Sequence, residues 1–326
     1  MSAPELKVAT GPSTRLQSPV VRAIGGSDLE VHPLALGANV FGWTVGDTAA
    51  KRLLDLYADA GGTLIDTADS YAGGRSETIL GSWMASKGNR DRIVVSTKVG
   101  KSADHPGLSQ KSLTDAVEAS LGRLRVERID LLFLHIDDRQ TPFDETLLAV
   151  DRLIRQGKVR WFGGADHLGN RLVEARIASG MMGVAPMIAL QKEYNLLSRA
   201  DYERDLMTVA ENQHLGVLPR YTLAGGFLSG KYKTKDDIRK ARRSSELGRF
   251  FGKRGLRILS VLEQVADEQE VSMATIAIAW LLTRPNVVAP VVSATNVDQL
   301  RELLAAPLIG LTRQQVASLD EVSAWK

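Results

Sequence analysis

Four polar residues of this sequence have the chemistry of a proton-transfer site. Asp66, Lys98 and His135 each end a short apolar segment, and Tyr71 follows Asp66 by five positions. An ammonium near a tyrosine favours the phenolate, and a carboxylate keeps the ammonium charged and in place. With a histidine hydrogen-bonding the substrate oxygen, such a set can protonate an oxygen that becomes an alkoxide as a hydride reaches carbon. None of these groups supplies a hydride, so the chemistry requires a nicotinamide cofactor.

Each of the four residues also has a structural interpretation when it is taken singly. Asp66 could cap the next element, and Lys98 could lie in a solvated loop. Tyr71 could pack in the core, and a lone histidine such as His135 is more often a core residue than a catalytic one. Their placement at or after the ends of successive apolar segments favours the catalytic interpretation.

The elements that must position these residues repeat along the chain. Short β-rich runs alternate with stretches of helical periodicity, at a spacing of roughly 30 residues that is typical of a βα unit. The runs begin near Leu34, Thr63, Ile93, Ile129, Val159, Met187, Gly216 and Val287. Eight such units predict a (β/α)₈ TIM barrel of the α/β class, in which catalytic groups lie at the carboxyl ends of the strands. The alternative is a doubly wound open sheet, but the sequence has no G-x-G-x-x-G string of the dinucleotide-binding kind.

Other segments lie outside the regular repeat. We predict a flexible tail over residues 1–20, a single domain over 21–326, and a β-hairpin at 22–31 that turns at Gly25-Gly26. The seventh unit is longer than the others. It has room for a long loop (222–255) and for two helices, 256–268 and 272–283, and a further C-terminal helix begins after the N-cap Thr312.

Composition excludes several classes of protein. Of 326 residues, 44% are hydrophobic and 24% charged, as in globular proteins, and there is no cysteine for disulfides or thiolate metal sites. No apolar run has the length of a membrane span and no signal peptide is visible, so we expect a cytoplasmic protein. The histidines lack the spacing of a metal site, and we expect no metal and no nucleic-acid partner.

The positive charge of the chain is concentrated in one segment. The net charge is +3, yet residues 231–257 contain 11 Lys and Arg against 3 Asp and Glu. This basic segment is either a solvated loop or a cover over an anionic cofactor. The second interpretation would use Lys233, Arg239, Arg242 or Arg243, and would make cofactor affinity fall with salt.

Several strings together resemble one family, the aldo-keto reductases. They are 65–71 followed by Gly73, Ser76-Glu77 and Leu80-Gly81, then Ser96-Thr97-Lys98, Leu134-His135 and 157–160. The resemblance extends from about residue 21 to the end, and is to the bacterial NAD(P)H-dependent oxidoreductase branch. It implies a (β/α)₈ barrel that reduces an aldehyde, ketone or sugar. It also implies that Tyr71 is the general acid/base, that Lys98 lowers the pKa of Tyr71, that Asp66 holds Lys98 and that His135 orients the carbonyl.

The resemblance implies a cofactor site as well. It assigns Ala38, Asn39, Asp66, Ala165, Asp166, Gln191, Arg220, Tyr221, Leu223, Gly226, Lys231, Ser293, Thr295, Gln299 and Glu302 to cofactor binding. Two of these, expected at the nicotinamide end, depart from the family pattern. Asp166 stands where relatives have an Asn that grips the nicotinamide carboxamide, and Arg220 stands where an aromatic residue stacks on the ring, with Tyr221 as an alternative one position along. A cation at Arg220 would repel the oxidised nicotinamide and weaken its binding relative to the reduced form.

The remaining cofactor signals concern its phosphates. The string 225–232 fits G-x-x-x-x-G-K, but it has Tyr232 where a triphosphate-binding loop needs Ser or Thr, so a loop over the pyrophosphate is the favoured interpretation. Ser293 and Gln299 stand where many NADP-binding relatives have Lys and Arg. We expect NADP(H) to be preferred, with Arg301 or the basic segment as substitute cations, and NAD(H) to be possible.

The substrate and the direction of reaction stay open at this point. Trp43 stands where relatives line the substrate mouth, although packing is an equal alternative. The expected activity is carbonyl reduction. The alternatives are a dehydrogenase that mainly oxidises a sugar or alcohol, and a redox-sensing regulatory protein that binds the cofactor with little turnover. The presence of all four catalytic residue types argues against the regulatory interpretation.

Overall fold

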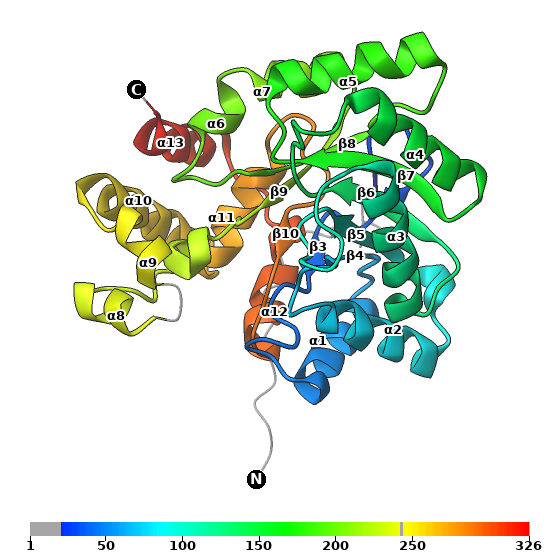
Figure 1. Ribbon diagram of the computed structural model, residues 1–326. Coiled ribbons are helices and arrows are strands. Elements are labelled where there is room, and N and C mark those ends of the chain that lie inside the picture. The colour runs from blue at the N-terminus through cyan, green and yellow to red at the C-terminus, as the bar shows by residue number, and fades with distance from the viewer. Residues whose placement is uncertain (1–20, 242–243, 326) are drawn as a thin grey trace.

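A sheet of eight parallel strands forms the centre of the protein, and helices surround it (Figure 1). The computed structural model describes residues 21–241 and 244–325. The strands, in sheet order after β10, follow the chain order. They are β10 (Val291–Val292), β3 (Ala35–Gly37), β4 (Leu64–Asp66), β5 (Val94–Val99), β6 (Ile129–Leu134), β7 (Val159–Ala165), β8 (Ala189–Glu193) and β9 (Gly216–Arg220). Strands β3 to β9 each begin within two residues of the predicted position.

The last strand closes the barrel in two steps. The Val217 amide donates to the Asn286 carbonyl and the Val288 amide donates to the Val217 carbonyl, both at 2.8 Å, which attaches this segment to β9. Further along, Val291 pairs with Ala35 of β3. Pro290, between the two attachments, has no amide hydrogen and interrupts the ladder. The predicted (β/α)₈ barrel is therefore confirmed, with its eighth strand split.

The predicted N-terminal hairpin is also confirmed. Strands β1 (Arg22–Ala23) and β2 (Glu30–Val31) pair antiparallel. Gly25 in the turn has φ +55°, and a Cβ there would lie 2.2 Å from the Ile188 carbonyl oxygen, so the turn requires glycine. Ile24 and Leu29 of the hairpin are fully buried among side chains of the barrel interior. The hairpin thus closes the barrel at the amino end of the strands. The predicted tail, 1–20, lies outside the described residues.

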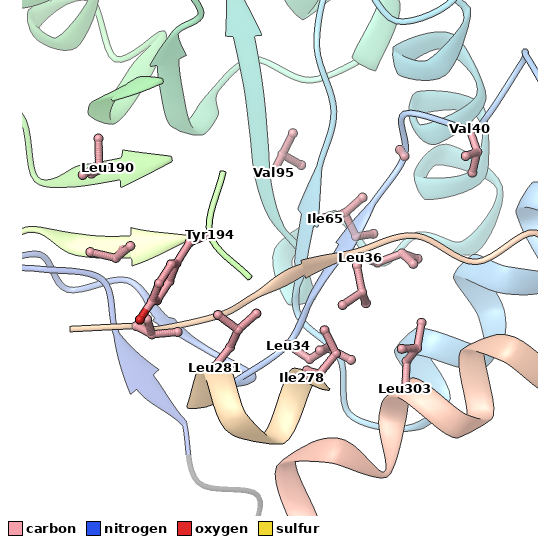
Figure 2. Close-up of a cluster of buried hydrophobic side chains, with 14 of the residues drawn as sticks. Leu34, Leu36, Val40, Ile65, Val95, Leu190, Tyr194, Ile278, Leu281 and Leu303 are labelled. Carbon is pink, nitrogen blue, oxygen red and sulfur yellow. The ribbon is translucent and has the colours of Figure 1, made fainter. Parts of the chain in front are cut away.

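The alternating pattern of each strand divides the core into two parts. In β6, Leu131 and Phe133 point into the barrel, whereas Leu132 and Leu134 point outward to the helices. Figure 2 shows the outer part, where side chains of the strands gather with side chains of the surrounding helices. They are Leu34 and Leu36 beside and within β3, Ile65 of β4, Ile278 and Leu281 of α11 (Met273–Leu282), and Leu303 of α12 (Val297–Leu304).

The helices alternate with the strands as expected. They are α1 (Asp47–Asp59), α2 (Arg75–Lys87), α3 (Gln110–Leu124), α4 (Phe143–Arg155), α5 (Gly169–Met182), α6 (Ala200–Glu203), α7 (Leu206–Asn212), α10 (Lys253–Glu268), α11 and α12. The Ser272 side chain caps α11, and Thr312 forms a capping box at the start of α13 (Arg313–Ser323). Helix α13 packs on α10, which confirms the extra C-terminal helix.

The long segment after β9 is more regular than its sequence indicates. It contains η2 (Ala224–Ser229), α8 (Lys235–Lys240), α9 (Ser244–Leu247) and η3 (Gly248–Phe250). A capping box between Thr234 and Asp237 starts α8, and buried Phe227, Leu247 and Phe250 anchor the segment. Figure 1 shows α8, α9 and α10 grouped to one side of the barrel. Arg242 and Arg243 of the predicted basic cover lie outside the described residues.

Candidate active site

The carboxyl ends of three neighbouring strands bring the predicted catalytic residues together. Asp66 ends β4, Lys98 lies near the end of β5, and His135 follows β6 directly. Because these strands are parallel neighbours, their ends lie at one mouth of the barrel. Tyr71 reaches the same place from the turn after β4. That turn contains three successive residues with positive φ, Ala72, Gly73 and Gly74, a conformation that favours glycine at the last two.

A buried ion pair forms the floor of the site. The Lys98 Nζ lies 2.6 Å from Asp66 Oδ2 and 2.7 Å from the Thr67 carbonyl oxygen, and the Lys98 side chain is 0% exposed. The other oxygen of Asp66 accepts hydrogen bonds from Ser96 Oγ at 3.0 Å and Gln191 Nε2 at 3.1 Å. Burial alone would lower the pKa of the Lys98 ammonium, but the charge and hydrogen bond of Asp66, together with the neighbouring Tyr71, outweigh burial and raise it. Lys98 is thus a cation that Asp66 and the Thr67 carbonyl hold in a fixed position.

Tyr71 and His135 lie over this cation. The Lys98 Nζ is 4.9 Å from the centroid of the Tyr71 ring, and the Tyr71 and His135 rings meet edge to face at 6.1 Å between centroids. Burial, then the charges of Lys98, Lys101 and Arg220, lower the pKa of His135 to about 2. The imidazole is therefore neutral, with one nitrogen carrying a hydrogen. A neutral imidazole beside a phenol can donate a hydrogen bond to a carbonyl oxygen.

Two signature residues hold the Tyr71 turn rather than face the cleft. The Ser76 Oγ donates to the Ala38 carbonyl at 2.8 Å. Glu77, fully buried, accepts from Thr97 Oγ1 at 2.5 Å and from Arg123 Nε at 2.7 Å. These contacts attach the start of α2 to β5 and α3. The string therefore positions Tyr71 through its neighbours.

A cleft of about 540 Å³ opens at this mouth and extends toward η2 and α12. Tyr71 and Asp66 line one end of it. Most residues assigned to the cofactor by resemblance also line it, together with Trp43, whose side chain is about half exposed. They are Asn39, Asp66, Gln191, Arg220, Tyr221, Leu223, Gly226, Lys231, Ser293, Thr295, Gln299 and Glu302.

The remaining predicted residues lie beside the cleft. Ala38 directly follows β3, Ala165 ends β7, and both are buried. Asp166, Lys98 and His135 are not among the residues that line the cleft.

Several residues at or near the cleft were not predicted from the sequence. Thr44 and Ser229 line it, and the amine of Lys101 lies 4.0 Å from an Asp166 oxygen. A lysine in a loop carries no local signal of such a contact.

The far part of the cleft has features suited to an anionic, extended ligand. Gly226 has φ +93°, and a Cβ there would lie 2.9 Å from the Lys231 amine. The backbone at Gly226 therefore lies close to the Lys231 ammonium. Asn296 caps α12 by accepting from the Gln299 amide, and the start of this helix borders the cleft. Ser293 Oγ donates to the carbonyl of Gly37 and lies 2.7 Å from Asn39 Oδ1. Lysine side chains, backbone N–H groups in glycine turns and helix N-termini are groups that bind phosphates.

Asp166 and Arg220, which the resemblance assigns to the nicotinamide end, contact each other. Arg220 Nη2 lies 2.9 Å from both Asp166 oxygens, and Arg220 Nε lies 3.3 Å from one of them. Both side chains are partly exposed, Arg220 at 36% and Asp166 at 29%. The neighbouring Tyr221, with φ +55°, donates its hydroxyl to Glu246 at 2.7 Å.

Within 21–241 and 244–325, no group of three or more His, Asp or Glu side chains is arranged to hold a metal ion. The helices in these ranges are each too short or too polar to cross a membrane.

Comparison with known proteins agrees with this geometry. The Aldo/keto reductase family pattern matches residues 33–324. A probable voltage-gated potassium channel subunit beta of Arabidopsis thaliana is 33% identical, over 87% of this chain and 89% of its own length. The uncharacterized oxidoreductase YrpG of Bacillus subtilis is 32% identical over 92% and 94%, and the norsolorinic acid reductase of Aspergillus flavus 29% over 91% and 79%. The fold, the site and these matches lead to one conclusion: the chain belongs to the aldo/keto reductase family of oxidoreductases.

Proposed function

We propose that this protein transfers a hydride between NAD(P)H and the carbonyl carbon of a small aldehyde, ketone or sugar, with Tyr71 exchanging the proton. The observation that supports this most is the Lys98–Asp66 pair, buried beneath Tyr71 at one end of the cleft. Aldo-keto reductases use NAD(P)H and bind small carbonyl substrates, so the cleft has a family-level precedent.

The residues of the site have distinct roles in this proposal. Tyr71 gives its proton to the oxygen that gains charge as hydride arrives, and the Lys98 ammonium stabilises the phenolate that remains. Asp66 keeps Lys98 oriented, and Ser96 and Gln191 keep Asp66 oriented. Neutral His135 donates a hydrogen bond to the carbonyl oxygen. The bound cofactor supplies the hydride.

The residues that line the cleft fit a dinucleotide. Gln191 offers an amide near the catalytic end, and Lys231 with the glycine turn at Gly226 offers charge and close backbone for the pyrophosphate. We propose NADP(H) as the preferred form, with NAD(H) as an alternative. Arg301 lies on α12, the helix whose Gln299 and Glu302 line the cleft. Its 3.0 Å pair with Asp298 is exposed, so this ion pair is weak enough to be exchanged for one with a 2′-phosphate.

This preference has its own test. Fluorescence titration with NADPH and NADH should show tighter binding of NADPH. Arg301→Gln should weaken NADPH by about two- to fivefold and leave NADH unchanged. Equal binding of both cofactors, unaffected by the substitution, would exclude the preference.

The central experiment follows the hydride itself. NADPH carrying deuterium at the 4-pro-R or the 4-pro-S position is incubated with the protein and a panel of aldehydes, ketones and sugars, and the products are read by mass spectrometry. We expect deuterium from the 4-pro-R position in the alcohol product. Transfer from the 4-pro-S position, or no transfer to any carbonyl by a protein that binds NADPH, would contradict the proposed reaction.

Turnover measurements with the same protein and cofactors distinguish two other functions from carbonyl reduction. A dehydrogenase working mainly in oxidation would turn over NADP⁺ and an alcohol or sugar faster than the reverse pair. A cofactor-binding regulatory role is favoured by the relative named as a probable potassium channel subunit beta. The grouping of Tyr71, Lys98, Asp66 and His135 at one mouth favours turnover, and a measurable steady-state rate would exclude a purely regulatory role.

A further inference from the structure

The Asp166–Arg220 pair joins two residues that lie 54 positions apart in the sequence. Asp166 follows β7 in a left-handed conformation, with φ +60°, and Arg220 ends β9. The resemblance implies an amide at the first position and an aromatic ring at the second, and each residue present here carries a charge instead. The two charges are opposite, and three contacts of 2.9–3.3 Å join the guanidinium to the carboxylate.

This pair lies next to the reacting end of the cleft. The Asp166 amide donates to the Gln191 carbonyl at 3.0 Å, and the Gln191 side chain contacts Asp66. Arg220 itself lines the cleft, and its charge contributes to the low pKa of His135. Because Tyr71 and Arg220 line the same cleft, a nicotinamide ring placed for hydride transfer beside Tyr71 would lie in the electric field of the Arg220 charge. Lys101 adds a third charge at 4.0 Å from Asp166, but it is 42% exposed and largely screened.

We propose that the Asp166–Arg220 pair sets the relative affinity of the cleft for the oxidised and the reduced cofactor. The inference rests on the function proposed above. The oxidised nicotinamide carries a positive charge and the reduced ring carries none. An unpaired guanidinium would therefore repel only the oxidised form. Asp166 cancels this charge at contact distance, so the pair provides a planar guanidinium in the cleft without the repulsion expected from Arg220 alone.

Single substitutions on the two sides of the pair should shift the affinities in opposite directions. The measured quantity is the ratio of the dissociation constants of NADP⁺ and NADPH, obtained by fluorescence and calorimetric titration. Asp166→Asn leaves a bare cation, and the ratio should rise about tenfold. Arg220→Gln leaves a bare carboxylate, which attracts the oxidised ring, and the ratio should fall below the wild-type value. The double variant should return to it.

A ratio is the right readout because it cancels effects that both cofactor forms share. The amide that Asp166→Asn introduces could improve the grip on the carboxamide, but it would do so for both forms. The matched control is Asp28→Asn, which removes a carboxylate paired with Arg160 beside the hairpin, at the other end of the barrel. It changes the net charge equally and should leave the ratio unchanged.

The possible outcomes separate this inference from the proposed function. Shifts of equal sign in the two single variants, or a ratio unchanged in both, would overturn the inference while leaving hydride transfer intact. A wild-type protein that bound neither form of the cofactor would overturn both. Opposite shifts, restored in the double variant and absent in Asp28→Asn, would support the inference.

Discussion

Two ion pairs on opposite sides of the same site differ in nearly every physical respect. Lys98 and Asp66 meet at 2.6 Å on adjacent strands and are 0% and 2% exposed. Arg220 and Asp166 meet at 2.9 Å across β7 and β9 and are 36% and 29% exposed. The first pair is enclosed by further hydrogen bonds, whereas the second is partly exposed to solvent, and its Arg220 lines the cleft.

The difference shows which side of the site can vary. Breaking a buried pair leaves an uncompensated charge and costs about 3–5 kcal/mol, because water cannot replace the lost partner. An exposed pair contributes about 0–1 kcal/mol and can be changed without unfolding the protein. The β4–β6 side is therefore constrained to its residue types. The β7–β9 side, where Asp166 and Arg220 form the exposed pair, can be used to tune binding.

The largest effect is expected where the buried pair is broken. Lys98→Met should lower turnover by about 10²–10⁴-fold, since the phenolate of Tyr71 loses its stabilising charge. It should also destabilise the fold by about 3–5 kcal/mol, because the Asp66 carboxylate is left buried without a cation. Urea denaturation and steady-state kinetics measure the two losses.

A matched substitution on the surface isolates the role of burial. Lys87 pairs with Asp55 at 2.9 Å, but the two side chains are 50% and 38% exposed. Lys87→Met should change stability by no more than about 0.5 kcal/mol and leave turnover at the wild-type value. Equal losses of stability and turnover in Lys98→Met and Lys87→Met would contradict the conclusion that burial determines the contribution of each pair.

A smaller effect is expected from Asp69, a buried carboxylate in the turn that precedes Tyr71. Burial, then the charge of Glu77, raises the pKa of Asp69 to about 6. The native state then holds a proton more tightly than the unfolded chain, so stability falls as the pH rises from about 4 to 6. Asp69→Asn should remove this fall and stabilise the protein by about 1–3 kcal/mol at pH 7.

Thermal unfolding from pH 4.5 to 8 measures this difference. The control is Asp59→Asn, the same change at an exposed position at the end of α1. It should follow the wild-type curve at every pH. A stability difference between Asp69→Asn and wild type that does not vary with pH would show that the charge of Asp69 is not its source.

The smallest of these effects concerns the exposed side and the basic segment. Lys231 lines the cleft, whereas Lys235 lies on α8 outside it. Lys231→Met should weaken NADPH by about five- to tenfold and reduce the dependence of its affinity on salt. Lys235→Met should have almost no effect. If both lysines contributed equally, the segment would act as a diffuse positive field rather than through one contact.

Much of the barrel and its catalytic side could be predicted from the sequence, because the evidence there is local. Alternating apolar runs define each strand, and the residue that ends a run in a parallel barrel must lie at the mouth. Asp66, Lys98 and His135 come together for this reason alone. Capping residues such as Ser272 and Thr312 define helix starts just as locally.

The parts that could not be predicted depend on contacts between distant segments. Nothing near Asp166 in the sequence indicates that it pairs with Arg220. The sequence therefore predicts that Arg220 repels the oxidised nicotinamide, without the carboxylate that neutralises its charge. The short helices after β9 are similarly stabilised by buried Phe227 and Phe250. The hydrophobic periodicity of this segment does not predict that these two side chains are buried. Other arginines of the basic segment are used structurally. Arg254 donates to the carbonyls of Leu197 and Ser323, and so attaches α10 to distant segments.

The proton-donating role of Tyr71 is tested most directly by Tyr71→Phe, assayed for carbonyl reduction and for NADPH binding in the same preparation. The ring that packs over Lys98 is kept and only the hydroxyl is lost. We expect a fall in kcat of about 10²–10⁴-fold with an unchanged dissociation constant for NADPH. Wild-type turnover by this variant would contradict the proposed mechanism, because no proton would then need to come from Tyr71.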